Sequence, residues 1–217
     1  MPPLISCIVP VFNGETYLDE TLDSIFAQAY RPLEVIVIDD GSTDGTGNLV
    51  KARTEEIIYI HQDNAGPAAA RNLGVATASA DYLAFIDADD LWLAEKLTRQ
   101  MELFDANPML DVCVTKIQNF WIDALESDRE KFKNHPIAQE LPGYGFPTSL
   151  IRRRTFDTLG LIDESLRTGE DTEWFMRVME SPSLIQLLPE VFVRRRIHQN
   201  NMTHDTTDMI NNLTKIL

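Results

Sequence analysis

Apolar runs of strand length alternate along the chain with segments whose apolar residues recur at helical spacing. The runs at residues 4–11, 34–38 and 82–86 hold β-branched or aromatic side chains in nearly unbroken order, which predicts strands covered on both faces. Further strands are expected at residues 57–60 and 111–121, and helices at 15–29, 46–52, 67–76 and 92–106. This alternation predicts an α/β fold with a mainly parallel central sheet between helices.

The second half of the chain is less regular. Residues 123–145 are polar and contain Pro136, Pro142, Gly143 and Gly145, which predicts a long loop of the kind that often carries function. Beyond it we expect a helix at residues 171–179, strands at 184–188 and 191–197, and a terminal helix at 208–217. A chain of 217 residues is expected to form one domain.

Composition limits the partners of the protein. Thirty-four acidic against nineteen basic residues give a formal charge of −15, which disfavours binding to nucleic acid or to an anionic membrane surface. No apolar run approaches the roughly 20 residues of a membrane helix, and the N-terminus lacks a signal-peptide pattern, so we expect a soluble cytoplasmic protein. Cys7 and Cys113 lie in apolar strand-like segments, where reduced core thiols are expected.

The strand predicted at residues 82–86 runs directly into three carboxylates, Asp87, Asp89 and Asp90. Hard oxygen ligands on a rigid strand end suit a divalent cation that carries a phosphate group. The alternative is a solvated turn, where aspartate is also common, and Asp90 can instead cap a helix that begins near Trp92. The first interpretation predicts that the protein handles a nucleoside diphosphate.

Polar residues also follow two earlier strands, at residues 10–13 and at Asp39 and Asp40. In a mainly parallel sheet these strand ends and residues 87–90 emerge on the same edge, so we expect one site there. The helix predicted from Pro67 begins with small residues, and its free backbone N–H groups can donate hydrogen bonds to a phosphate. Arg71, one turn later, offers a fixed positive charge, unless it is an ordinary surface arginine.

Five short blocks of the sequence resemble the signature blocks of family 2 glycosyltransferases, in the same order. They are Val9-Pro10-Val11-Phe12-Asn13, Asp39-Asp40-Gly41-Ser42-Thr43-Asp44, Asn64-Ala65-Gly66 with Ala70-Arg71-Asn72-Leu73-Gly74, Asp87-Ala88-Asp89-Asp90, and Gly169-Glu170-Asp171. The resemblance covers the first half closely and the second half through the last block only. It implies the Rossmann-like, nucleotide-sugar-binding A-type glycosyltransferase fold, a divalent metal (Mn²⁺ or Mg²⁺) and an inverting reaction.

The resemblance also implies roles for the residues that would bind the donor. Asp89 is implied to be the direct metal ligand, and Asp87 to face the ribose or the sugar. Asp40 is similar to the family aspartate that hydrogen-bonds the base, usually uracil, with Asp39 in support. The remaining residues implied to line the nucleotide-sugar site are Pro10, Phe12, Asn13, Glu15, Asn64, Gly66, Arg71, Ala88 and Glu170. Phe12 is otherwise a core residue.

In the second half, Asp171 is the candidate general base that takes the proton of the attacking hydroxyl; alternatively it stabilises a helix N-terminus. Trp174 either packs under the acceptor sugar or is buried in its helix. His198 is similar in position to a histidine that joins the metal or diphosphate shell in many relatives, although a lone histidine after a strand is often an ordinary surface residue. Arg196, with its two neighbouring arginines, is expected to hold the diphosphate, but strand alternation lets at most two of the three point into the site.

We therefore expect a metal-dependent inverting transferase that moves one sugar from a UDP-sugar or related nucleotide sugar to a carbohydrate or lipid-linked acceptor, in polysaccharide, glycolipid or cell-surface glycan synthesis. Residues 1–120 would bind the donor and residues 121–217 the acceptor. The absence of membrane helices and of a Gln-x-x-Arg-Trp block favours transfer of a single sugar over processive synthesis.

Two other functions stay open at this point. One is a non-catalytic sugar-nucleotide-binding or partner module. The other is a sugar-phosphate nucleotidyltransferase, which would be expected to carry a glycine- and arginine-rich loop where this chain has residues 10–13. A homodimer through the terminal helix and a peripheral membrane location set by the acceptor are also left open.

Overall fold

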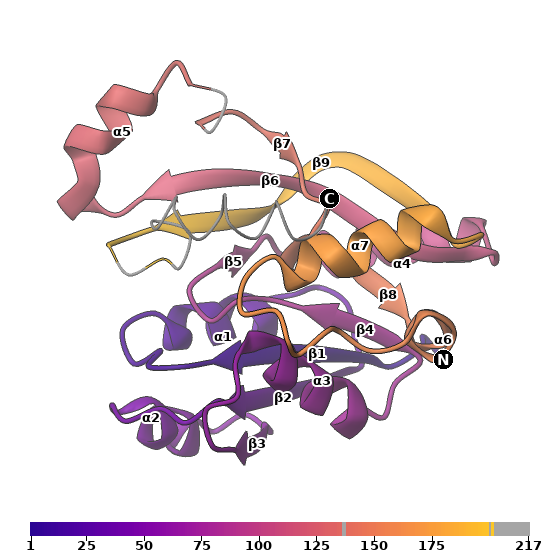
Figure 1. The fold of residues 1–217 in the computed structure, drawn as a ribbon, viewed down its shortest axis with the longest axis horizontal. Helices are drawn as coiled ribbons and strands as arrows, with labels where there is room; N and C mark the ends of the chain where they lie inside the picture. The colour runs from indigo at the N-terminus through magenta and orange to yellow at the C-terminus, as the bar shows by residue number, and fades with distance from the viewer. Residues whose placement is uncertain (136–137, 200, 202–217) are drawn as a thin grey trace.

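A computed structural model describes residues 1–135, 138–199 and 201 of the chain (Figure 1). Within these residues nine strands form one sheet in the order β3-β2-β1-β4-β8-β6-β9-β5, with β7 paired to β6. The sheet runs without interruption through both predicted halves of the chain. The terminal helix predicted at residues 208–217 lies outside the described residues.

The first half of the chain forms the parallel part of the sheet, as predicted. Strands β1 (Ile5–Val11), β2 (Leu33–Asp39), β3 (Ile58–His61) and β4 (Tyr82–Phe85) are mutually parallel. Helices α1 (Leu18–Phe26), α2 (Thr46–Ala52) and α3 (Pro67–Thr77) connect them. The unbroken apolar sequences of β1, β2 and β4 are explained by burial on both faces, whereas β3 at the edge of the sheet is partly exposed.

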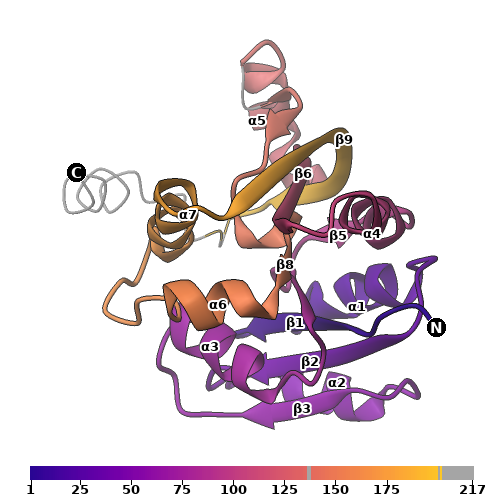
Figure 2. The same cartoon turned by 90° about the vertical axis from the view of Figure 1, so that its right-hand side faces the viewer.

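Two apolar cores lie on opposite faces of this sheet, and Figure 2 shows the helices that cover each face. One core receives side chains from α1, α2 and α4 (Lys96–Ala106), and the other receives them from α3, α6 (Arg153–Leu159) and α7 (Glu170–Glu180). Alternate residues of β1 enter different cores, with Cys7 in the first and Ile8 in the second. The prediction of a sheet between helices is therefore confirmed, and both cysteines are free and buried as expected.

The second half adds strands that the sequence did not indicate. Strand β8 (Leu150–Arg152) is antiparallel to both β4 and β6 (Leu110–Trp121). The two strands predicted at residues 184–188 and 191–197 are one strand, β9 (Leu184–Ile197), parallel to β6. Its register shifts after Leu188, which pairs with Thr115 while Val191 pairs with Lys116, so the gap predicted between the two strands is an irregularity within one strand.

The helix predicted at residues 92–106 begins later than expected. Leu91 and Trp92 form the short strand β5, which pairs antiparallel with β9, and α4 starts at Lys96. The cap predicted for Asp90 is therefore wrong, because tertiary pairing takes the residues that follow it into a sheet.

The long loop predicted at residues 123–145 is also wrong in part. It contains a 3₁₀ turn (Asp123–Leu125), helix α5 (Glu126–Phe132) and strand β7 (Leu141–Pro142). The described side chains of α5 are exposed, and ion pairs three positions apart, such as Arg129 with Glu126 at 3.0 Å, stabilise it. Figure 1 shows α5 standing away from the helices that cover the sheet. With no apolar stripe, this helix leaves no periodic signal in the sequence.

In the described part of the chain, no helix has the length and apolar character needed to cross a membrane.

A lysine lies in the first core. Lys96 is fully buried, and its ammonium donates to Gln100 Oε1 at 3.0 Å and to the carbonyl of Ser149 at 3.2 Å. The ammonium also lies 4.2 Å from the centre of the Trp92 ring. Burial lowers the pKa of Lys96 to about 7, well below its ordinary value of 10.5. The folded protein thus holds the Lys96 proton less strongly than the unfolded chain does, and at neutral pH this difference lowers the free energy of unfolding.

We expect the free energy of unfolding to rise by about 2 kcal/mol between pH 7 and pH 8.5, because the unfolded chain keeps the Lys96 proton that the folded protein releases. Urea unfolding at several pH values measures this rise. In the unfolded chain the cysteines, whose ordinary pKa is about 8.5, begin to ionise at the upper end of this window and offset part of the rise. The offset is the same in the wild type and in both lysine variants, so the comparison between them carries the test. The variant Lys96→Met should lose the rise, whereas Lys133→Met, which changes an exposed lysine, should keep it. The same pH dependence in Lys96→Met and the wild type would contradict the assignment.

Candidate active site

The structure brings the polar ends of β1, β2 and β4 together on one edge of the sheet, as the sequence predicts for parallel strands. The backbone N–H of Asp40 donates to the carbonyl of Val11 at 2.8 Å, and that of Ile86 donates to the carbonyl of Ile8 at 3.1 Å. The turns that follow these strands therefore start in a fixed register.

The turn after β1 is tied to the turn after β2. Asn13 has a positive φ of 52°, and its side-chain oxygen accepts from the backbone N–H of Thr43 at 2.9 Å. The carboxylate of Glu15 accepts from the backbone N–H of Gly45 at 2.9 Å. Pro10 is half-buried, and Phe12 is 54% exposed, so Phe12 is not a core residue. Asn13 and Glu15 thus fix the shape of the edge, and Phe12 presents an aromatic ring on it.

Asp40 holds the loop that leads into α3. Its carboxylate accepts from Gln62 Nε2 at 2.6 Å and from the backbone N–H groups of Ala65 at 2.9 Å and Gly66 at 2.8 Å. The side-chain amide of Asn64 donates to the Asp40 carbonyl at 2.8 Å. A Cβ added at Gly66 would meet nothing within 4 Å, so the space before the α3 N-terminus is open. The predicted contact of Asp40 with the base stays a prediction.

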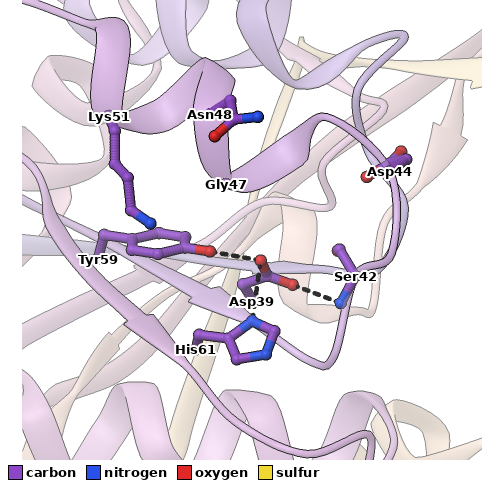
Figure 3. Close-up of a pocket in the computed structure, with 8 residues that line it drawn as sticks. All are labelled: Asp39, Ser42, Asp44, Gly47, Asn48, Lys51, Tyr59 and His61. Atoms are coloured by element: carbon purple, nitrogen blue, oxygen red, sulfur yellow. Dashed lines mark hydrogen bonds and ion pairs between the residues drawn. The ribbon is translucent and has the colours of Figure 1, made fainter.

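Asp39 points to the other face of the sheet, because neighbouring residues of a strand alternate. Asp39 lies in a pocket of about 330 Å³ between α2 and β3, and Figure 3 shows Tyr59 and His61 beside it. Its carboxylate accepts from the Ser42 backbone N–H at 2.8 Å and the Tyr59 hydroxyl at 2.5 Å. Burial alone would raise the pKa of Asp39, but hydrogen bonds from Ser42 and Tyr59 outweigh it and lower that pKa. Asp39 therefore supports the strand end as an anion.

Residues 87–90, here called the carboxylate turn, carry three acidic side chains in different surroundings. Asp87 is half-exposed, Asp89 is less exposed, and Asp90 is buried and accepts from the backbone N–H of Arg196 at 3.0 Å. Ala88 lies in the same turn, and its backbone carbonyl accepts from the hydroxyl of Thr21 at 3.0 Å. Burial, and then the negative charge of Asp87, raises the pKa of both Asp89 and Asp90. The turn is a concentration of negative charge that needs cations nearby.

Arg71 supplies one of those cations. Its guanidinium donates to Asp87 Oδ1 at 2.8 Å and to Glu170 Oε1 at 2.7 Å, and its side chain is only 7% exposed, so it is not a surface arginine. The ring of Phe146 lies 5.4 Å from it. Its buried Nε has no hydrogen-bond partner among the described residues. Arg71 therefore connects the carboxylate turn with the predicted Glu170-Asp171 block.

That block begins helix α7, after Gly169 with a φ of +80°. Glu170 is buried, which raises its pKa, while the Arg71 charge opposes this. Asp171 Oδ1 accepts from the backbone N–H of Thr172 at 2.7 Å, and its Oδ2 lies 3.2 Å from where a Cβ of Gly145 would be. The helix-stabilising contact and a role as base are compatible, because they use different oxygen atoms.

Trp174 does not reach an acceptor. It is fully buried, stacks on Phe156 with ring centres 4.6 Å apart, and donates to the carbonyl of Gly160 at 3.2 Å. The alternative of packing under an acceptor sugar is therefore wrong, because the indole fills the second core.

His198 lies against the carboxylate turn. Its Nε2 is 2.8 Å from Asp89 Oδ2, and the Asn201 side-chain amide donates to the same oxygen at 3.1 Å. The ring of Tyr17 lies 4.7 Å from the imidazole. His198 is thus no isolated surface residue. Its partners Tyr17 and Asn201 were missed in the sequence because neither belongs to a recognisable block.

Asp89 and His198 fit a divalent metal by their chemistry. A carboxylate oxygen and an imidazole nitrogen that lie 2.8 Å apart suit Mn²⁺, whereas Mg²⁺ favours oxygen ligands. The described residues contain no group of three His, Cys, Asp or Glu side chains placed to hold a metal ion. Further ligand atoms would therefore have to come from a diphosphate, from water or from other protein groups.

A family model described as glycosyl transferase family 2 matches residues 6–160. The chain belongs to glycosyltransferase family 2. The resemblance to this family is thereby confirmed. The match covers the first four sequence blocks and extends past the predicted boundary at residue 120 into the strand and helix that follow the loop, whereas the Gly169-Glu170-Asp171 block lies outside it.

Among the curated relatives, an uncharacterized glycosyltransferase of Rickettsia typhi is 28% identical over 96% of this chain and 68% of its own length. The crystal structure of Staphylococcus aureus TarS 1–349 in complex with UDP is similar with a TM-score of 0.72 at 21% identity, over 98% of this chain and 64% of that one. A mannosyltransferase from Pyrobaculum calidifontis in complex with GDP-Man and Mn²⁺ gives a TM-score of 0.75 at 20% identity, over 100% of this chain and 63% of that one. These structures confirm the A-type glycosyltransferase fold. The chain spans about two thirds of the relative and slightly less of each structure.

Removing the Arg71 charge should destabilise the protein strongly. We expect Arg71→Met to lower the free energy of unfolding by about 3 kcal/mol, because Glu170 stays buried without its cation. Adding Glu170→Gln should recover part of this loss, since the uncompensated charge is then gone.

Urea unfolding at pH 7.5 measures these changes. Arg154→Met is the matched control, because Arg154 is half-exposed and pairs with Asp111 at 2.8 Å on the surface; it should cost less than about 1 kcal/mol. Equal losses in Arg71→Met and Arg154→Met would contradict the bridging role.

Proposed function

We propose that the protein is a metal-dependent inverting glycosyltransferase that moves one sugar from a nucleoside-diphosphate sugar to an acceptor hydroxyl. The observation that carries this proposal is the Arg71 bridge, which sets the donor-side Asp87 and the Glu170-Asp171 block around one guanidinium. A reaction between a donor and an acceptor needs both groups of residues at one place.

Asp89 and His198 would hold the divalent cation, which stabilises the charge that develops on the departing diphosphate. Gly66 leaves open space before the α3 N-terminus, where backbone N–H groups favour an anion. Phe12 offers an exposed ring near the strand ends for the nucleoside. The donor is proposed to be a UDP-sugar; TarS is known in complex with UDP and the mannosyltransferase with GDP-Man and Mn²⁺, so both nucleotides belong in the test.

Asp171 would take the proton of the acceptor hydroxyl as that oxygen attacks the anomeric carbon. Attack from the side opposite the departing diphosphate inverts the configuration. The acceptor is proposed to be a carbohydrate or a lipid-linked sugar of a glycan under synthesis, with a cytoplasmic location at or near the membrane surface. The competing function is a binding module without catalysis, and measured sugar transfer decides between the two.

Asp171→Asn should lower the rate of sugar transfer by about 10²–10⁴-fold, because the amide cannot accept the hydroxyl proton. Binding of UDP in Mn²⁺, measured by calorimetry, should stay within twofold of the wild type. Glu173→Gln is the control, since Glu173 lies in the same helical turn but pairs with Arg177 at 2.7 Å; its transfer rate should be nearly unchanged. Normal transfer by Asp171→Asn would remove Asp171 from the role of base.

A calorimetric screen of UDP, GDP and their common sugar conjugates, with Mn²⁺ and with EDTA, tests the donor and the metal together. We expect one nucleotide to bind more than tenfold tighter in Mn²⁺, because the cation joins two anionic partners. Asp89→Asn should lose this enhancement, whereas Asp63→Asn, an exposed change in the loop before α3, should keep it. Equal affinity in Mn²⁺ and EDTA for the wild type would refute the metal requirement.

A further inference from the structure

Arg196 was expected to hold the diphosphate, but in the structure its guanidinium is turned toward the protein. Nε donates to the backbone carbonyl of Asp89 at 2.9 Å, and Nη2 donates to Glu20 Oε2 at 2.5 Å. The rings of Tyr17 and Phe120 lie 4.7 and 4.8 Å from the guanidinium. Only 7% of the residue is exposed, so its charge is held between two aromatic rings and an acidic side chain of α1.

The backbone of Arg196 holds the same turn as its side chain. Its N–H donates to the carboxylate of Asp90 at 3.0 Å, and its carbonyl accepts from the side-chain amide of Asn201 at 3.2 Å. Asn201 in turn donates to Asp89 Oδ2 and accepts from the backbone N–H of His198 at 2.6 Å. One residue therefore contacts the carboxylate turn at two points and is linked through Asn201 to both candidate metal ligands.

Asp89 follows β4 and His198 follows β9, so their separation depends on how the end of β9 is held against the turn after β4. The Arg196 side chain joins that turn to α1 through Glu20, alongside the Thr21 hydroxyl of α1, which bonds the carbonyls of Ala88 and Asp90. A pair of ligands that is already at its working separation binds a cation more tightly, because less order has to be imposed on binding.

We propose that Arg196 is a positioning residue for the candidate metal pair, and that Glu20 controls metal-assisted donor binding without touching metal or nucleotide. This inference rests on the proposed function, since it concerns the same site. It differs from the diphosphate contact expected from the sequence, because a positioning residue acts only when the cation is bound.

The measurement that separates the two roles is nucleotide affinity by calorimetry, once in Mn²⁺ and once in EDTA, with whichever of UDP and GDP the wild type binds. The ratio of the two dissociation constants reports the contribution of the cation alone. We expect Glu20→Ala to reduce this ratio about tenfold, as is usual for residues that orient metal ligands, while its affinity in EDTA stays within twofold of the wild type. Arg196→Lys should behave in the same way, because lysine keeps the charge but lacks the two-sided guanidinium geometry.

Asp19→Ala is the matched control. Asp19 precedes Glu20 in the first turn of α1 and pairs with Arg53 instead, so this variant removes the same charge at nearly the same place. Its ratio should remain within twofold of the wild type. Thermal unfolding checks that Glu20→Ala is folded, which we expect because the Glu20 side chain is 59% exposed.

Two results would overturn the inference. Equal ratios for Glu20→Ala and Asp19→Ala would mean that the ion pair does not act on the site, and weakened binding by Arg196→Lys in EDTA as much as in Mn²⁺ would restore the direct diphosphate contact. A wild-type ratio near one is a different failure, because it refutes the metal dependence in the proposed function itself.

Discussion

The buried guanidinium of Arg71 is the contact on which the arrangement of the site depends. It pairs with Glu170, 99 positions away in the sequence, and with Asp87 in the turn after β4. A buried ion pair adds little net stability when both charges are matched, but breaking it is costly. The start of α7 and the carboxylate turn are therefore held at a fixed separation, and each is in place only when the other is.

The sequence was sufficient for the elements whose burial leaves a periodic pattern. The runs that became β1, β2 and β4 are apolar because both faces of the sheet are covered. It was insufficient for β5 and β8, of two and three residues, since so short a segment has no measurable period and becomes a strand only through its neighbours. Helix α5 was not predicted from the sequence for a different reason: an exposed helix has no apolar face and so no periodic pattern.

The candidate site shows the same division between local and long-range information. The blocks around Asp40, Asp89 and Asp171 were recognised because each is a short run of characteristic residues. Glu20 and Gln62, whose side chains meet Arg196 and Asp40, carry no local signal, since only the fold brings them there. The sequence also assigned Asp40 and Arg196 to the ligand, whereas the structure shows how each supports a neighbouring segment; a direct contact of Asp40 with the nucleotide remains a prediction.

The charge balance at the edge gives a physical reason to expect a divalent cation there. The chain carries a net charge of −15, and its carboxylate turn would repel a diphosphate. The guanidiniums of Arg71 and Arg196 bond this turn, but Arg71 is engaged by Asp87 and Glu170, and Arg196 by Glu20 and the Asp89 carbonyl. Their charge is largely matched by carboxylates of the protein. An anionic donor that approaches Asp89 therefore needs positive charge from another source. A cation between carboxylate and phosphate oxygen atoms would supply that charge. A further buried arginine could do so only by displacing a group that already bonds the turn.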